Sequence, residues 1–499
     1  MAGGMKTLAK ETAIYGVSSI LGKFLNWLLT PLWSYVLINQ SQMGEVGLLY
    51  SWTALIIVVL TYGMETGLFR FANKEKENPN TVYSTTLISI GATSLLFVAV
   101  AILFLQPFST VFGSPNIKPH YVLLLTIILG LDAFSAIPFA YLRFQKRPIR
   151  FASIQILNVV ATIVFNLFFF VACPWLAVKF PETFAWFDIR NGVDFILISN
   201  LLASSIRLLL LSPQLNVKYV FDAKLLRKML AYSLPLLVLG FAGIMNQILD
   251  KILYPYLSTE PDFMEQLGVY SASFKIAVIM VMFAQAFRYA FEPFIFAKNK
   301  EPGNDNRNAY SEATRYFILF GLLIFLAVTG YMDIIKYLLK STYHEGLQIV
   351  PIVMIGELFF GVYFNLSLWY KLTDKTQWGT YLSIFGLAIT LAINILFVPQ
   401  FGYMACAWAS FFANVAMMLA SYFLGQKYYP INYNLKSAAT FFALALVLYA
   451  GIALSHRYVG SVWLRLLINS VIVAVYMLAV IKKEVPLREI PVIGRYFKK

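Results

Sequence analysis

Apolar side chains occur along this chain in long runs, which short polar segments separate. A membrane-spanning helix needs about 20 mostly apolar residues, and irregular backbone cannot face lipid. Windows of that length predict fourteen spanning helices, and no connection between them is long enough for a folded domain. They lie near residues 12–38, 44–70, 82–106, 119–142, 149–173, 192–213, 230–257, 267–297, 312–339, 346–371, 377–398, 401–426, 436–455 and 462–481.

The predicted helices contain an internal repeat. The segments ATIVFNLFF and ITLAINILF, in the fifth and eleventh helices, share a Thr-x-x-x-Asn pair at one offset of 228 residues. The fifth and eleventh helices are six helices apart, so each repeat contains six helices. Because six is an even number, both halves enter the membrane in the same sense, as in transporters that bind substrate between parallel repeats. The matched positions are Thr162 and Asn166 with Thr390 and Asn394, and Gly47, Tyr50 and Ser51 with Gly268, Tyr270 and Ser271.

These patterns predict an all-α polytopic membrane protein with two parallel six-helix lobes and two further helices at the C-terminus. The outer connection near 174–191 is predicted to be an interfacial hairpin. The last segment mixes basic and apolar residues, so we expect it on the inner leaflet, with a solvated tail as the alternative. The predicted units are an N-lobe (1–213), a cytoplasmic linker (214–229), a C-lobe (230–426), two helices (427–481) and a basic cytoplasmic tail (482–499).

The composition agrees with a membrane protein. Of 499 residues, 60% are hydrophobic and 13% are charged, and the mean hydropathy is +0.71. A soluble chain has about 45–50% apolar and about 25% charged residues. The composition therefore excludes a cytosolic enzyme and a disordered chain. Two cysteines are too few for a disulfide-stabilised secreted scaffold.

The net charge of +15 indicates the orientation. With the N-terminus inside, 27 Lys and Arg residues lie in loops and helix ends on the inner side and 6 on the outer side. Cytoplasmic loops of membrane proteins carry such an excess of basic residues. We therefore predict that both termini are cytoplasmic. This bias explains most of the positive charge without a nucleic-acid partner.

Three segments resemble bacterial polysaccharide-transport proteins, the O-antigen flippases of the multidrug/oligosaccharidyl-lipid/polysaccharide flippase superfamily. They are LPLLVLGFAGIMNQILDKILY (234–254), GVYSASFKIAVIM (268–280) and GVYFNLSLWYKLTDKTQWGTY (361–381). The resemblance extends over essentially the whole chain. It implies a V-shaped pair of lobes around a central cavity, in the bacterial inner membrane. It also implies alternating-access transport of undecaprenyl-pyrophosphate-linked oligosaccharide (O-antigen, capsule or exopolysaccharide repeat units) to the periplasmic leaflet. The partners would be membrane lipids and the polysaccharide polymerase and chain-length machinery.

Six basic residues lie inside predicted helices, and each is a candidate site because a charge in the membrane needs a cavity or a partner. Lys23 is about 16 Å into the first helix, near the middle of the hydrocarbon core. Asn26 and Thr30 follow at helical spacing, so the three form one polar stripe that suits a pyrophosphate-binding cavity wall. The alternative is a structural pair of Lys23 with Asp132 or Glu357.

Three further cations are candidates for the same substrate cavity. Lys275 lies in the eighth helix, with Ser271 one turn earlier on the same face. Arg288 points about 220° around the helix from Lys275 and has a second interpretation, a pair with Glu292. Arg207 lies near the inner end of the sixth helix, where it either extends to the interface or meets a phosphate.

Ion coupling needs a carboxylate that binds an ion or a proton. Asp132 and Glu357 lie near mid-depth in the fourth and tenth helices. The resemblance implies a sodium site among the seventh, eleventh and twelfth helices, where Asp250 and Asn394 are the nearest candidates. The neighbouring Lys251 gives Asp250 an alternative role in a structural or gating pair. No resident cofactor is predicted; the candidate coupling ions are Na⁺ and H⁺, and transport without a coupling ion is the alternative.

Other functional classes have distinguishable features. A lipid II-type flippase would also have a cationic cavity, whereas a cation-coupled multidrug antiporter would favour acidic and aromatic cavity walls. A membrane-embedded glycan polymerase or acyltransferase needs catalytic residues on a large outer loop, which the pattern does not predict. The three His residues fall near outer helix ends, and no phosphate-binding loop motif occurs. The sequence therefore favours a transporter without catalytic residues.

Overall fold

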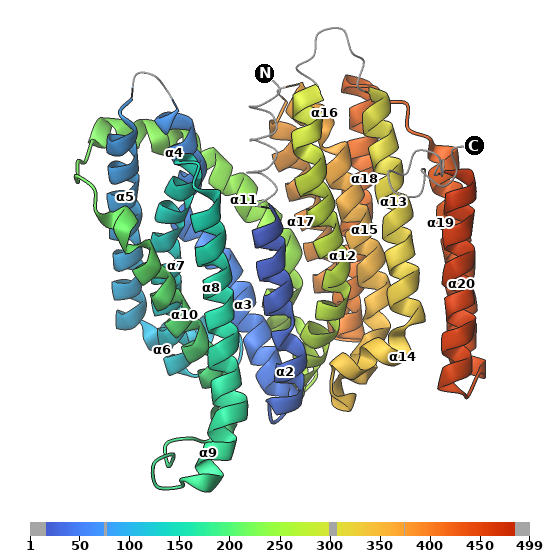
Figure 1. The fold of residues 1–499 in the computed structure, drawn as a ribbon, viewed down its shortest axis with the longest axis horizontal. Helices are drawn as coiled ribbons and strands as arrows, with labels where there is room; N and C mark the ends of the chain where they lie inside the picture. The colour runs from blue at the N-terminus through green and yellow to red at the C-terminus, as the bar shows by residue number, and fades with distance from the viewer. Residues whose placement is uncertain (1–15, 74–76, 299–306, 374, 485–499) are drawn as a thin grey trace.

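The computed structural model describes residues 16–73, 77–298, 307–373 and 375–484, and the elements in this part of the chain are helices (Figure 1). Thirteen of them are long and apolar enough to cross a membrane. They correspond in order to the second to fourteenth predicted spans. In the first predicted span, residues 16–27 are helical and a break at Leu28 separates them from α2 (Leu29–Val36). Residues 12–15 lie outside the described part, so the predicted number of fourteen is not confirmed.

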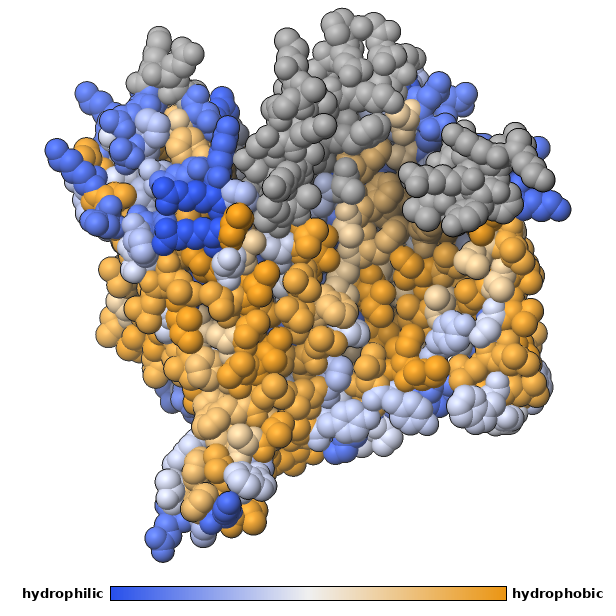
Figure 2. Space-filling model, viewed as in Figure 1, coloured by the Kyte–Doolittle hydropathy of each residue, from blue (hydrophilic) through white to orange (hydrophobic). Residues whose placement is uncertain are grey.

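The helices form two lobes, with α19 and α20 at the outer edge of the second (Figure 1). Figure 2 shows apolar side chains covering the middle of the visible face, with hydrophilic residues gathered toward the two ends. The first lobe contains α2, α3 (Gln40–Thr61), α4 (Met64–Ala72), α5 (Pro79–Leu103), α6 (Leu105–Val111), α7 (Pro119–Phe144), α8 (Pro148–Leu167), α9 (Cys173–Lys179) and α10 (Gly192–Leu215). The second lobe and edge pair contain α11 (Ala223–Leu257), α12 (Phe263–Lys298), α13 (Arg307–Gly330), α14 (Met332–Ile335), α15 (Val350–Leu366), α16 (Leu368–Leu372), α17 (Gln377–Phe401), α18 (Tyr403–Tyr428), α19 (Leu435–Tyr458) and α20 (Val462–Lys483).

Short irregular helices complete these elements. A π-helix at Phe168–Ala172 joins α8 to α9, which projects with the following segment from one end of the molecule (Figure 1). The predicted hairpin near 174–191 thus begins as helix. The 3-10 helices are Ile189–Asn191, Lys336–Leu338 and Ser341–Ile349.

The second predicted span, 44–70, is broken rather than continuous. Tyr62 and Gly63 have φ values of 30° and 70°, which end α3 and redirect the chain into α4. Only glycine adopts this region without steric cost. A Cβ at Gly63 would also lie 2.8 Å from the Ser233 carbonyl oxygen of α11. The break therefore allows the first lobe to approach α11 closely.

The single helix α11 packs on both lobes. Its first turns contact α4 and α5, and its later turns contact α17. Asp222 caps its N-terminus by accepting hydrogen bonds from the backbone N–H groups of Lys224 and Leu225. The segment predicted as a linker, 214–229, therefore contains the end of α10 and the first two turns of α11.

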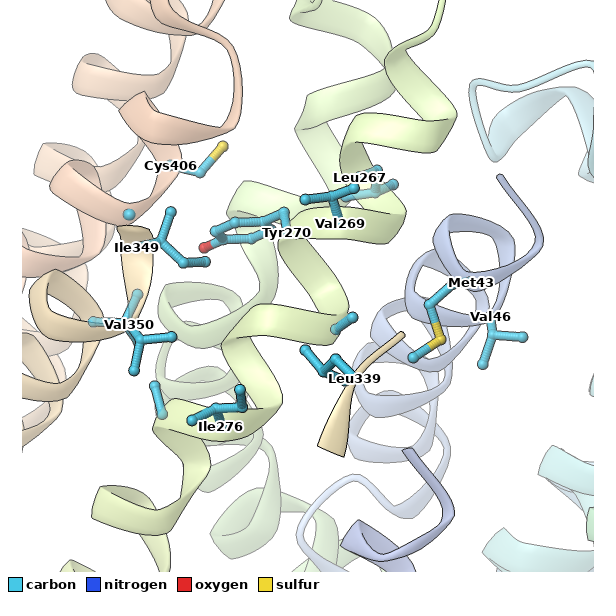
Figure 3. Close-up of a cluster of buried hydrophobic side chains, with 14 of the residues drawn as sticks. Met43, Val46, Leu267, Val269, Tyr270, Ile276, Leu339, Ile349, Val350 and Cys406 are labelled. Atoms are coloured by element: carbon cyan, nitrogen blue, oxygen red, sulfur yellow. The ribbon is translucent and has the colours of Figure 1, made fainter. Parts of the chain in front are cut away.

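The two lobes meet where α3 packs against α12. A Cβ added at Gly44 would lie 2.1 Å from the Met264 carbonyl oxygen, so the two backbones approach closely. Figure 3 shows Met43 and Val46 of α3 in the same buried cluster as Leu267 of α12. Gly47 and Ser271, which belong to the two matched repeat segments without being equivalent positions, also face each other here. Two halves related by a symmetry axis are expected to bring equivalent segments into contact near that axis.

Candidate functional site

A cavity of about 500 Å³ lies between the two lobes. Its walls come from the first described helix, α2 and α3 on one side and from α11, α12 and α15 on the other. Among the described lining residues, four are basic and one is acidic. These charged residues are Lys23, Lys251, Lys275, Arg288 and Glu357. The cavity wall is therefore predominantly cationic.

The first described helix holds Lys23 against the opposite lobe. The Lys23 ammonium donates a hydrogen bond to Gln285 Oε1 at 2.7 Å, and Trp27 Nε1 donates to the Lys275 carbonyl oxygen at 2.6 Å. Lys23 thus contacts a neutral amide rather than Asp132 or Glu357, the two alternatives that the sequence left open. Thr30, the third member of the predicted stripe, also lines the cavity.

The cations of the cavity lie near one another, so that their positive charges repel. Lys23 and Arg288 are close enough to repel, and so are Lys251 and Lys275. The Arg288 guanidinium lies 5.1 Å from the centre of the Phe364 ring, while the side chain of Glu292, its alternative partner, is outside the described residues. Like charges in a poorly hydrated space cost free energy unless an anion lies between them. The arrangement therefore suits an anionic ligand.

Lys251 belongs to a buried cluster at the cavity wall. Its ammonium is 3.3 Å from Asp250 Oδ2 and 4.0 Å from the centre of the Phe274 ring. The Tyr270 hydroxyl donates a hydrogen bond to the same carboxylate. Asp250 is buried behind this wall, whereas Glu357 faces the cavity. Lys251 is thereby compensated, and Lys23, Lys275 and Arg288 carry the excess positive charge.

Asn26, Asp132 and Arg207 lie beside the central cavity rather than in it. Asn26 lines a neighbouring space of about 390 Å³ that also contains Lys23 and Lys275. Arg207 forms an ion pair with Asp132 inside the first lobe, in a small cavity of about 130 Å³. In this conformation the pair connects α7 and α10.

Asn394 is buried between helices, and its repeat mate makes the same hydrogen bond. Asn394 Nδ2 donates to the Thr390 carbonyl oxygen at 2.7 Å, as Asn166 Nδ2 does to that of Thr162 at 2.8 Å. Thr390 Oγ1 also donates to Asn246 Oδ1 at 3.0 Å, which ties α17 to α11. Asn394 Oδ1 has no hydrogen-bond donor among the described residues. This face of α17 thus presents an oxygen acceptor in a buried position.

Lys251 and Gln285 line the cavity but were not predicted to bind the substrate. Lys251 appeared as a partner of Asp250 alone, and Gln285 was not selected. A helical-wheel comparison identifies Gln285, since it lies three residues before Arg288 on nearly the same face of α12. No group of three His, Cys, Asp or Glu side chains in the described ranges is arranged to hold a metal ion.

Comparison with known proteins relates this architecture to a family. A family model described as "Polysaccharide biosynthesis protein" matches residues 8–297, more than half of the chain. A comparison with curated protein sequences finds no significant match.

Solved structures share the fold at low sequence identity. The lipid II flippase MurJ in an inward closed conformation aligns with a TM-score of 0.73 and 12% identity, over 95% of this chain and 100% of that one. The MATE multidrug transporter DinF-BH, in a ligand complex, aligns with a TM-score of 0.60 and 16% identity, over 84% of this chain and 95% of that one. A MATE structure in the straight conformation aligns with a TM-score of 0.59 and 13% identity, over 85% of this chain and 95% of that one. The chain is therefore a multi-pass membrane protein with the two-lobed fold of these transporters.

Proposed function

Because the chain belongs to the polysaccharide biosynthesis protein family, we propose that it is a flippase for a lipid-linked glycan. The substrate is an undecaprenyl-pyrophosphate-linked oligosaccharide, such as an O-antigen, capsule or exopolysaccharide repeat unit. It moves from the cytoplasmic to the periplasmic leaflet of the bacterial inner membrane by alternating access, and no covalent bond is made or broken. Polysaccharide polymerase and chain-length proteins are the proposed partners on the periplasmic side.

The positive charge of the central cavity carries this proposal. Lys23, Lys275 and Arg288 converge on one space, and Glu357 is the single carboxylate among its described lining residues. A pyrophosphate would lie between these cations and relieve their mutual repulsion, since Lys and Arg bind phosphate oxygens through charge-assisted hydrogen bonds. The prenyl chain would remain in lipid between the lobes.

The same charge distribution distinguishes the rival functions. A cation-coupled drug antiporter would have to place an organic cation beside Lys23 and Arg288, at an electrostatic cost. A lipid II-type flippase, by contrast, fits the charge equally well, because its substrate also carries a pyrophosphate. The choice between the two lipid-linked substrates depends on the glycan.

The proposed unit of movement is the six-helix lobe. The N-lobe (1–213) and the C-lobe (230–426) rock against each other about the α3–α12 contact. The two C-terminal helices (427–481) move with the second lobe. The basic loops and the basic tail (482–499) face the cytoplasm. The excess of 27 over 6 basic residues supports that orientation.

For coupling we propose Glu357 as the residue that exchanges an ion with the cavity. Glu357 faces the cavity, whereas the charge of Asp250 is compensated by Lys251 and Tyr270. Asp250 and Asn394 are the alternative site, each four residues beyond a partner of the Thr390–Asn246 hydrogen bond that ties α17 to α11. Imposed H⁺ and Na⁺ gradients in proteoliposomes distinguish these two ions, and Glu357→Gln is expected to abolish the gradient dependence if the ion is H⁺.

Reconstituted transport tests the function directly. Proteoliposomes would contain a prenyl-pyrophosphate-linked disaccharide, and flipping would be followed as the appearance of sugar in the opposite leaflet. We expect transport by the wild type and at least a tenfold loss in the variant Lys23→Ala/Arg288→Ala. The control variant Lys224→Ala/Arg227→Ala removes two charges from an exposed helix start and should transport normally. Transport of cationic drugs without flipping of the prenyl pyrophosphate would overturn the proposal.

A further inference from the structure

The segment between α10 and α11 carries exposed aromatic side chains beside a basic one. Residues 216–222 connect the two helices, and in Figure 1 this green segment passes beside the end of α5. The side chains of Tyr219 and Phe221 are 57% and 51% exposed, and Lys218 is exposed as well. Tyrosines beside basic residues are typical of the headgroup level of a membrane.

Hydrogen bonds to α5 fix the depth of this segment. The Val220 backbone N–H donates to Ser84 Oγ at 2.8 Å. The Asp222 backbone N–H donates to Thr85 Oγ1 at 3.2 Å. These two hydroxyl-bearing residues lie about 8 Å along α5 from its first residue, Pro79. The exposed aromatic side chains of the segment therefore lie beside the first turns of a membrane-spanning helix and not beyond its end.

The turn between α7 and α8 adds two basic residues at the same end of the first lobe. Lys146 and Arg147 are exposed, and Ile149 in the first turn of α8 is 73% exposed. Phe144, just before this turn, and Leu215, at the end of α10, pack against the same buried cluster. Figure 2 shows hydrophilic and apolar side chains next to each other at this end of the lobe. We call this surface the elbow patch, and it consists of Lys146, Arg147, Ile149, Lys218, Tyr219 and Phe221.

The described acidic residues at this end of the lobe are already engaged. Glu65 pairs with Arg143 at 2.8 Å, and Glu77 lies 3.7 Å from Lys228. The Asp222 carboxylate accepts hydrogen bonds from the first backbone N–H groups of α11. The three basic residues of the elbow patch, in contrast, form no ion pair within the described ranges. Their positive charge is therefore directed to the surroundings of the protein.

We propose that the elbow patch binds an anionic phospholipid. Its phosphate would lie among Lys146, Arg147 and Lys218, and its acyl chains would lie along α5 beside the exposed aromatic rings. Basic clusters next to a membrane attract negative headgroups, whereas a zwitterionic lipid would gain less from the three cations. In the proposed orientation this lipid comes from the cytoplasmic leaflet and holds the start of α11 at the headgroup level. The patch shares no residue with the described lining of the substrate cavity.

Lipid retention on the full-length protein tests the charge of this site. Purified protein in detergent would be titrated with phosphatidylglycerol or with phosphatidylcholine of the same acyl chains, and bound lipid counted by native mass spectrometry. We expect the wild type to retain phosphatidylglycerol at least about threefold better. The variant Lys146→Gln/Arg147→Gln/Lys218→Gln should lose this preference.

A matched control changes the same number of charges at exposed positions of the second lobe. The variant Lys375→Gln/Lys427→Gln/Lys436→Gln should keep the preference for phosphatidylglycerol. Equal retention of the two lipids by the wild type would overturn the proposal, and so would an equal loss of preference in both triple variants. Undecaprenyl phosphate held at the patch in preference to phosphatidylglycerol would also overturn it.

A spin label tests the depth of the patch. Phe221→Cys and Lys427→Cys each add one reactive thiol, because the native cysteines are buried. In liposomes that contain phosphatidylglycerol, we expect the label that replaces Phe221 to be more accessible to oxygen, which concentrates in lipid, than to a water-soluble nickel chelate. The label that replaces the exposed Lys427 near the end of α18 should show the reverse. Greater accessibility to the nickel chelate at the first position would place the patch in water and contradict the proposal.

Discussion

Lys23 contacts the opposite lobe through one neutral hydrogen bond, to Gln285. Its charge is therefore available to an anionic substrate. We expect Lys23→Ala to weaken binding of a prenyl pyrophosphate about tenfold to a hundredfold, the usual effect of losing a charge-assisted hydrogen bond. Lys23→Arg should retain more binding, because it keeps the charge. Titration of the purified variants with undecaprenyl pyrophosphate measures both effects, and unchanged binding by Lys23→Ala would contradict the cavity role.

Gly63 marks the break between α3 and α4. Its φ of 70° costs about 1–2 kcal/mol for a residue with a Cβ, and that Cβ would meet the Ser233 carbonyl oxygen at 2.8 Å. We therefore expect Gly63→Ala to lower the thermal unfolding midpoint in detergent. Gly243→Ala is the matched control, since nothing lies within 4 Å of the position of its added Cβ. An equal midpoint for both variants would show that α11 can move away.

At the residue scale, the sequence predicted how deep a charged residue lies in the membrane better than it predicted which neighbour its side chain faces. The position of Lys23 within the first helix placed it in the membrane interior, and the structure brings it to the cavity with Lys275 and Arg288. The sequence also placed Asp132 and Arg207 in the membrane, yet they pair with each other inside the first lobe. Helical periodicity defines the face that a side chain occupies but not the neighbouring helix, because that depends on how the lobes pack.

The helices α19 and α20 are attached to the second lobe by polar contacts at both ends. At one end Asp333 accepts hydrogen bonds from Lys336 at 2.9 Å and from Arg465 Nε at 2.7 Å. At the other end Glu484, just after α20, pairs with Arg315 of α13. Such contacts suit helices that move together with the lobe on which they pack.

The Asp333 cluster predicts an acid-sensitive attachment of α20. Burial alone raises the pKa of this carboxyl, but the hydrogen bonds from Lys336 and Arg465 outweigh burial and bring the pKa below its ordinary value. The stabilisation is therefore fully present above about pH 4, the pKa of an unfolded aspartate, and is lost as the pH falls through the lowered pKa. His456 Nδ1 also lies 3.5 Å from this carboxylate.

We accordingly expect Asp333→Asn to destabilise the protein at pH 7 by about 3 kcal/mol, the lower range for breaking a buried ion pair. Thermal unfolding in detergent at pH 7 and at pH 3 measures this. The difference in unfolding temperature between variant and wild type should shrink at pH 3, where the wild-type carboxylate begins to be protonated. A difference that stays constant with pH would indicate that packing, not charge, attaches α20.

At the element scale, hydropathy alone predicted thirteen spans that the structure contains. Long apolar runs dictate helices in lipid because every backbone group must be satisfied internally. The breaks at Leu28 and at Tyr62 escaped prediction because neither interrupts the apolar run. The extension of α11 back to Ala223 depends on the Asp222 cap and on packing against the first lobe, neither of which a hydropathy window detects.

At the scale of the whole molecule, the contact between the lobes lies at one end of the cavity. A Cβ at Gly268 would lie 1.9 Å from the Gln40 carbonyl oxygen, and the Tyr35 hydroxyl donates to the Tyr337 carbonyl oxygen at 2.9 Å. Alternating access requires the two lobes to separate at this end of the cavity while they come together at the opposite end. The repeat predicted two similar halves, but which end is closed depends on the conformational state, which the sequence does not encode.

A cross-link across the closed end tests that movement. The variant Tyr35→Cys/Tyr337→Cys places thiols on two exposed positions, and the native Cys173 and Cys406 are both buried and should not react. We expect a short bifunctional maleimide to join the two thiols and to reduce transport in proteoliposomes at least tenfold, while each single variant treated alike remains active. The reagent should react less when Gly268→Ala is added, because the added methyl separates α3 from α12. Full transport by the cross-linked protein would show that the lobes do not need to part at this end.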